Sequence, residues 1–147
     1  MVRHPVLVPL SREHFSALAA AAHILAAGPE DDHAPLLQEL QGLALDVHFA
    51  EEEQVLARHL PPDLAKLLLA DHRDLRQLLA RLQEPTASHN DWLVLANRLR
   101  EHVRWEERMM FEVLTARLGT EGMAALRGLL RYADQVAATD LPRFGAE

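Results

Sequence analysis

Apolar residues recur every three or four positions over five segments of the chain, which is the spacing of one face of an α-helix. In the second segment, for example, Leu36, Leu40, Leu43 and Val47 follow this spacing. Proline, glycine and helix-capping residues separate the segments. The pattern predicts helices over residues 11–27, 35–59, 62–83, 90–118 and 120–138.

The connections between the first four predicted helices are short, and no strand-like alternation interrupts them. Short connections favour antiparallel neighbours in a helical bundle. A length of 147 residues is also typical of one domain. We therefore expect an all-α protein with a single domain over residues 1–147. It should be an antiparallel up-down-up-down four-helix bundle over residues 11–118, with an additional C-terminal helix over residues 120–138.

The first ten residues are apolar, but Pro5 and Pro9 interrupt them and no small-residue cleavage site follows. We interpret this segment as a lead-in strap rather than a signal peptide. No apolar run approaches the roughly 20 residues that span a bilayer. The net charge is −7, without the clustered lysines and arginines that nucleic-acid binding requires. We expect a cytoplasmic protein that binds neither membranes nor nucleic acids.

Two features of the composition bear on chemistry. The chain has no cysteine, which excludes disulfides, iron–sulfur ligation and thiol catalysis by its own residues. It has nine histidines, which is a high number for this length. Each of the first four predicted helices carries one of them on its apolar stripe: His14, His48, His72 and His102. The other five are predicted to lie in loops or on the solvated surface: His4, His23, His33, His59 and His89.

Two of the four helices also carry a glutamate four residues after the histidine, namely Glu52 and Glu106. Four residues advance a helix by about 400°, so each histidine and its glutamate lie one turn apart on the same face. Counted from the predicted helix ends, the four histidines lie at matching heights to within about one turn. The neighbouring Glu51, Glu53 and Glu107 lie off this face and are predicted to be solvated, although Glu51 could also support the site or act as a spare ligand.

Any one of these histidines, taken alone, is interpreted most simply as a hydrogen-bonded core residue. That interpretation does not explain six ionisable residues at the same depth of the bundle. Buried without partners, each would cost several kcal/mol, against a total stability of about 5–15 kcal/mol for such a domain. Metal ions would supply the missing partners. Imidazole and carboxylate ligands suit iron or manganese and also tolerate zinc. The predicted metal ligands are His14, His48, Glu52, His72, His102 and Glu106.

This ordered set resembles the hemerythrin-like family, in which one histidine, a His-x-x-x-Glu motif, another histidine and a second His-x-x-x-Glu motif lie on four helices. The resemblance implies a non-haem centre of two iron ions, with Glu52 and Glu106 and an oxo or hydroxo group as bridges. It also implies one iron on His14 and His48, and the other on His72 and His102.

The chain departs from the oxygen-carrying members of that family. Those have a second histidine on the third helix at four-residue spacing, where this chain has Leu68 and Arg76. They also use an aspartate five residues after the fourth-helix histidine, where this chain has Glu107. One ligand fewer argues against reversible oxygen carriage and leaves both irons more open. The ligand set most resembles the di-iron domain of iron–sulfur-cluster repair proteins.

Three functions fit this interpretation. The first is binding or reduction of a small oxidant (dioxygen, nitric oxide or peroxide) at the di-iron centre. The second is an iron donor or sensor in iron homeostasis or iron–sulfur-cluster repair. The third is a zinc-stabilised structural bundle whose metal only supports folding. The sequence assigns no enzymatic reaction, and helix 120–138 could cover a bundle face or form a homodimer contact.

Overall fold

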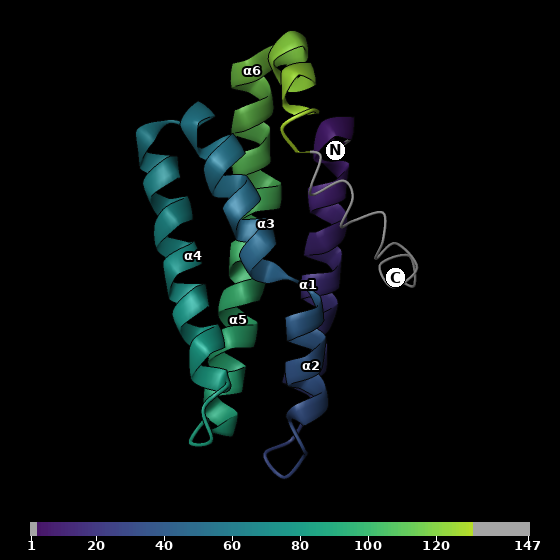
Figure 1. Cartoon of the computed structure of the whole chain (residues 1–147), viewed down its shortest axis with the longest axis vertical. Helices are drawn as coiled ribbons and strands as arrows, with labels where there is room; N and C mark the ends of the chain where they lie inside the picture. Colours follow the sequence, from purple (N-terminus) through teal and green to yellow (C-terminus); the bar gives the residue numbers. More distant parts are fainter. Residues whose placement is uncertain (1–2, 131–147) are drawn as a thin grey trace.

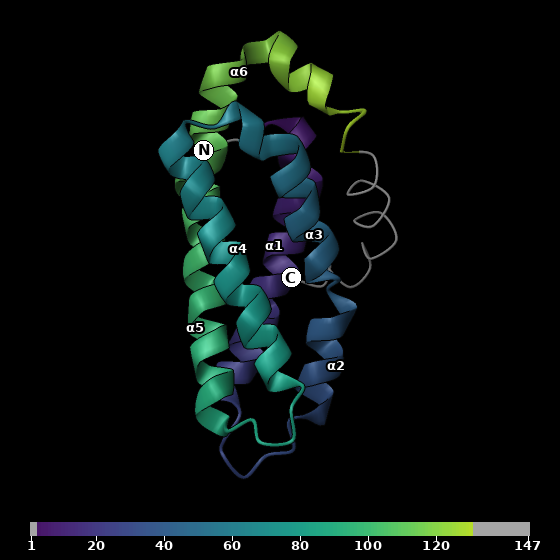
Figure 2. The ribbon, with the colours of Figure 1, turned by 60° about the vertical axis from the view of Figure 1, so that its left-hand side comes forward.

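The computed structural model describes residues 3–130, and within that range the chain forms helices and turns and no strand. Four helical segments lie side by side along the long axis of the molecule (Figures 1 and 2). The all-helical prediction is confirmed. Among these residues, no helix combines the length and the apolar character that crossing a bilayer requires.

The four segments are assembled from ten helical elements. In chain order these are η1 (Pro5–Leu7), α1 (Val8–Ala26), α2 (Ala34–Gly42), α3 (Leu45–Glu51), η2 (Glu52–Leu56), η3 (Ala57–His59), α4 (Pro62–Leu82), α5 (His89–Trp105), η4 (Glu106–Met110) and α6 (Phe111–Leu126). Elements η1 and η3 are 3₁₀ turns, whereas η2 and η4 are single π-helical segments inside longer helices. The structure thus places both π segments at the predicted Glu ligands.

The predicted N-terminal strap is helical from Pro5 onward, because η1 leads directly into α1. Pro5 and Pro9 occupy the first turns of these two elements, where a missing N–H costs no helical hydrogen bond. The apolar side chains of this segment are buried, among them Leu7 and Leu10. The strap is therefore part of the bundle rather than a lead-in to it.

The second predicted helix is divided at Ala44, which adopts a left-handed conformation with φ 52° and ψ 47°. Leu43 and Leu45 flank it and would lie about 200° apart on a continuous helix. Both are buried in the structure because the chain turns between them. The prediction of one helix over 35–59 was wrong, and the burial of both leucines is the physical reason for the break.

The predicted separate C-terminal helix is also not observed. α5, η4 and α6 follow one another without a loop, and α6 is kinked at Gly119, which has φ 65° and ψ −173°. Beyond the kink its last turns bend across one end of the bundle (Figure 2). Residues 120–126 therefore continue α6, and residues 131–138 of the prediction lie outside the described range.

Two apolar cores fill the bundle, one on either side of a layer of buried polar residues. The first core includes Ala17, Ile24, Leu40, Leu75 and Leu99. The second core includes Leu7, Leu10, Leu68, Phe111 and Met123. Because both cores are close to water-free, any charge in the layer between them must find its partners within the protein.

Replacing Ala44 with glycine tests the left-handed break. A side chain with a Cβ is strained in this conformation, so Ala44→Gly should raise the free energy of unfolding by up to about 1 kcal/mol. Ala22→Gly, at an exposed position inside α1, should lower it by about 1 kcal/mol. Denaturant titration of both variants measures the two changes, and equal losses would show that Ala44 is not strained.

Candidate metal centre

The six predicted ligands come from all four helical segments and meet in the polar layer. His14 lies on α1, His48 on α3, His72 on α4 and His102 on α5. Glu52 and Glu106 are the first residues of η2 and η4. All six side chains are at most 3% exposed. The matching heights that the sequence predicts are therefore present in the structure.

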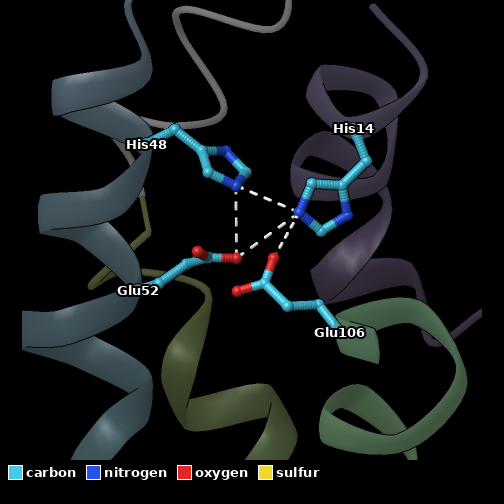
Figure 3. Close-up of side chains that lie close together, drawn as sticks. All are labelled: His14, His48, Glu52 and Glu106. Atoms are coloured by element: carbon cyan, nitrogen blue, oxygen red, sulfur yellow. Dashed lines mark hydrogen bonds and ion pairs between the residues drawn. The ribbon is translucent and has the colours of Figure 1, made fainter. Parts of the chain in front are cut away.

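The six side chains form two groups of four that share both glutamates, and within each group one ligand atom per residue lies within 4.8 Å of the others. In the first group, His14 Nε2 is 2.6 Å from Glu106 Oε1, and His48 Nε2 is 3.2 Å from Glu52 Oε2. Figure 3 shows these four side chains pointing toward one another.

The second group uses the other oxygen of each glutamate. His72 Nε2 is 3.1 Å from Glu52 Oε1, and His102 Nε2 is 3.2 Å from Glu106 Oε2. Each carboxylate thus gives one oxygen to each group, which is the arrangement of a ligand that bridges two metal ions. The partition of histidines, His14 with His48 and His72 with His102, is the one that the family resemblance implies.

Several of these atoms lie close together without forming hydrogen bonds. Both oxygens of Glu52, both oxygens of Glu106, and Nε2 of His72 and of His102 are buried and have no hydrogen-bond partner among the described residues. The nitrogen-to-oxygen distances between them and the other ligands are 2.6–3.6 Å, which is ion-pair distance, but none of these contacts is a hydrogen bond. A buried polar atom without a partner costs about 1–3 kcal/mol, so the arrangement calls for a group between them.

Without metal, opposite charges stabilise this layer. Burial is the largest influence on the pKa of His48 and lowers it, but Glu52 and Glu13 together raise the pKa to about 10. Burial likewise lowers the pKa of His102, and Glu106 and Asp71 together raise it to about 9. Burial and Glu106 raise the pKa of Glu52, but His48 and His14 lower it to about 2. The metal-free layer therefore holds imidazolium and carboxylate ions in place of metal and carboxylate.

The outward-facing nitrogen of every ligand histidine meets a carboxylate. A carboxylate only accepts hydrogen bonds, so each Nδ1 carries the proton and each Nε2 is left to face the centre. The Nδ1-to-oxygen distances are 2.5 Å for His14 and Glu107, 3.0 Å for His48 and Glu13, 2.7 Å for His72 and Glu53, and 3.1 Å for His102 and Asp71.

These contacts correct the prediction that Glu53 and Glu107 are solvated. Glu53 and Glu107 each come one residue after an inward-pointing glutamate, and consecutive helical residues point about 100° apart. Their side chains are therefore directed toward the neighbouring helix rather than toward water. Glu53 thus reaches His72 on α4, and Glu107 reaches His14 on α1. Glu51, which was predicted to be solvated or a spare ligand, is half-buried and belongs to neither group of four.

The sequence analysis missed Glu13 and Asp71 altogether. Each directly precedes a ligand histidine, His14 or His72, but binds a histidine of another helix. An acidic residue directly precedes a histidine at four places, Glu13, Asp32, Asp71 and Glu101, so this dipeptide alone does not single out Glu13 and Asp71. What repeats is the order: Glu13-His14 is followed one helical hairpin later by the His-x-x-x-Glu-Glu segment 48–53, and Asp71-His72 by the segment 102–107. The two halves of the chain repeat the same ligand pattern.

The repetition extends to an arginine and a phenylalanine outside the histidines. Arg3 donates to Glu107 and lies over the ring of Phe111, which stacks on His14. Arg76 donates to Glu53 and lies over the ring of Phe49, which stacks on His72. His14 and His72 are each fixed on two sides, by a carboxylate and by a phenyl ring.

The remaining histidines lie away from the centre. His23 has a side chain 62% exposed and pairs with Glu39, which confirms its predicted surface position. His33 precedes α2, whereas His89, predicted to lie in a loop or on the solvated surface, is the first residue of α5; ring nitrogens of the two are 3.2 Å apart. His4 accepts a hydrogen bond from the backbone of η1, and His59 ends η3.

Comparisons of the chain with family models, with curated proteins and with solved structures gave no match.

The stability of the metal-free protein should depend on pH above neutrality. Histidines whose pKa is raised in the folded state contribute stability below their unfolded pKa of about 6.5, and this contribution is lost as pH rises through the folded pKa. For His48 and His102 that range ends at about 10 and 9. Thermal unfolding between pH 6.5 and 10 should show a falling Tm without metal. An unchanged Tm across this range would contradict the charged layer.

Removing an outer carboxylate should weaken metal binding without removing a ligand. Glu53→Gln and Glu107→Gln should each reduce metal affinity by about 10- to 100-fold, because the supported histidine loses its orientation and basicity. Glu39→Gln is the matched control, since Glu39 pairs with the exposed His23 rather than with a ligand histidine. Competition with a chelator measures the affinities, and equal values for all three variants would exclude a supporting role.

Proposed function

We propose that the chain is a hemerythrin-like, up-down-up-down bundle that holds two iron ions and binds or reduces a small oxidant such as dioxygen, nitric oxide or peroxide. The observation that supports this best is the convergence of six buried atoms of Glu52, Glu106, His72 and His102 that have no hydrogen-bond partner among the described residues. In the metal-free layer imidazolium charges balance the carboxylates; when the histidines are neutral, the same atoms become lone-pair donors around one space, where a metal cation would be their partner.

The donor set supports two ions rather than one. Four imidazoles and two carboxylates form two four-residue groups that share the carboxylates. Two divalent ions would carry four positive charges, which the two bridging and four outer carboxylates together balance, so the site has enough negative charge to hold both ions. The four outer carboxylates lie behind the histidines and make these ligands more basic.

The ligand types support a redox metal. Structural zinc is held by four ligands that commonly include thiolates, whereas this chain has no cysteine. Imidazole and carboxylate ligands suit iron and manganese. A pair of iron ions can supply two electrons to an oxidant, one from each ion. The surrounding aliphatic side chains limit the access of water, which protects reactive species from side reactions.

A visible spectrum of iron-loaded, air-exposed protein tests the proposal. We expect charge-transfer absorption from a bridged ferric pair that changes when peroxide or nitric oxide is added. Iron that passes to an acceptor protein within minutes would instead favour an iron donor. A colourless protein with stoichiometric zinc that resists replacement by iron would favour a structural bundle and overturn the proposal.

Ligand substitutions test the site assignment. His72→Ala and Glu106→Ala should each lose about half or more of the bound iron, because a ligand is removed from one or both ions. His23→Ala should lose none, since that residue is exposed and distant from the centre. Metal analysis after gel filtration measures the contents, and equal contents in the three variants would refute the assignment.

A further inference from the structure

A second pair of histidines in contact, His33 and His89, lies away from the candidate metal centre. His33 ends the connection from α1 to α2, and His89 begins α5 directly after the connection from α4. Both connections lie at the end of the bundle opposite the bend of α6 (Figures 1 and 2). His89 is 13 residues before His102 on the same helix, which is about 20 Å along its axis. The pair is therefore separate from the centre.

The two facing ring nitrogens of this pair need a positive partner between them. His33 Nε2 is 3.2 Å from His89 Nδ1. A neutral imidazole has one N–H group and one lone pair. Two lone pairs, or two N–H groups, repel each other at this distance. The pair is therefore stable in two ways: it shares a proton as a hydrogen bond, or both lone pairs bind one metal ion.

The distance between the two nitrogens fits a shared zinc ion. Two imidazole nitrogens bound to a tetrahedral zinc at about 2.0–2.1 Å are about 3.3–3.4 Å apart. At the right angles of a square-planar site, the same bond lengths would place them about 2.8–3.0 Å apart. The observed 3.2 Å is nearer to the tetrahedral value. Both side chains are half-buried, so water can fill the other two positions on the ion.

The apolar core orients one of the two rings. The ring of His33 stacks on that of Trp92, with centroids 5.1 Å apart and planes inclined by 13°. Trp92 is 4% exposed and lies on α5, three residues after His89. One turn of α5 thus carries one ligand and the ring that orients the other. Little freedom of these side chains remains to be lost when an ion binds.

Carboxylates next to the pair offset an unfavourable charge. The pair lies at the N-termini of α2 and α5, whose partial positive charge disfavours a cation. Asp32 and Asp91 accept hydrogen bonds from backbone N–H groups at these ends, at 3.0 and 2.8 Å. Arg81, which is 3.5 Å from Asp91, is itself paired with Glu84 at 2.7 Å. Each helix end near the pair therefore carries its own carboxylate.

We propose that His33 and His89 form a second metal site, which takes one zinc ion with two imidazole nitrogens and two water molecules as ligands. The ion would hold the connection between α1 and α2 against the start of α5. This inference goes beyond the proposed function and does not rest on it, because it uses no ligand of the candidate centre.

The zinc stoichiometry of the full chain tests the site. Metal-free wild type and variants are dialysed against zinc, and the bound zinc is counted by elemental analysis. His33→Gln and His89→Gln replace a ligand with an amide that still offers a hydrogen bond but lacks the imidazole nitrogen that zinc prefers. Each should bind one zinc ion fewer than the wild type. The double variant should also lose one ion rather than two, because both residues hold the same ion.

His23→Gln is the matched control, since His23 is an exposed histidine that pairs with Glu39 rather than with another histidine. It should bind as much zinc as the wild type. A loss in this variant equal to that in His89→Gln would show unspecific binding to surface imidazoles. Unchanged zinc content in both His33→Gln and His89→Gln, or a loss of two ions in the double variant, would overturn the shared site.

Thermal unfolding separates a shared ion from a shared proton. Without zinc, the Tm of His89→Gln should be close to that of the wild type. With zinc at about 100 times Kd, the wild type should exceed the variant by about 5 °C or more, because the ion binds only the folded pair. Equal Tm values with zinc would leave the hydrogen bond alone and contradict the site. If the variants do not fold, nitrogen-15 NMR of the wild type decides: zinc should shift His33 Nε2 and His89 Nδ1, and unshifted resonances overturn the proposal.

The failures of the two proposals are distinguishable. A chain that takes up no iron, but loses one zinc ion in each glutamine variant, contradicts only the proposed function. A chain that takes up iron, but whose glutamine variants bind as much zinc as the wild type, contradicts only the second site.

Discussion

The burial of charge between two apolar cores is the constraint on which this structure depends. Four histidines and two glutamates lie in a layer that water does not reach, and each needs an opposite charge within the protein. The six side chains converge on one place, so that the two glutamates face all four imidazoles and supply the opposite charge. Convergence in turn fixes the register of every helix, since a shift of one residue would turn a ligand out of the layer by about 100°.

The local irregularities of the helices follow from the same constraint. Ala57 N–H bonds to the carbonyl of Glu52, and Phe111 N–H to that of Glu106, each five residues away. Such π turns are rare in proteins as a whole, but those that do occur are often found at functional sites. Within the described residues they occur only at the two bridging glutamates, so the widened turns are tied to the site. The outer ring of carboxylates then fixes which nitrogen of each histidine faces inward.

Much of the fold and of the site could be predicted from the sequence because helices leave a periodic signal. Four histidines on apolar stripes, and Glu52 and Glu106 one turn further on, were enough to identify the six converging side chains. The break at Ala44 left no such signal, since Leu43 and Leu45 both fit an apolar pattern and only packing decides that both are buried. Gly119 lies between two predicted helices, but its positive φ kinks α6 without ending it.

The outer carboxylates were predicted wrongly for a different reason. A residue that points away from the ligand-bearing face of its own helix was expected to face water. In a bundle, the flank of one helix is covered by the next, so Glu53 meets α4 and Glu107 meets α1. Neighbours in space, rather than periodicity along one helix, decide these positions. In the sequence, these contacts are marked by Glu53 and Glu107, each directly after an inward-facing glutamate.

The repeated ligand pattern has a consequence for how such a centre can arise. The segment formed by α1, α2, α3 and η2 and the segment formed by α4, α5 and η4 each contribute two imidazoles, one bridging carboxylate and two supporting carboxylates. Neither segment holds a complete shell for even one ion. Two copies of a single hairpin, associated face to face, would nevertheless supply every group required, so a symmetric ancestor joined by gene duplication is chemically sufficient to account for the present chain.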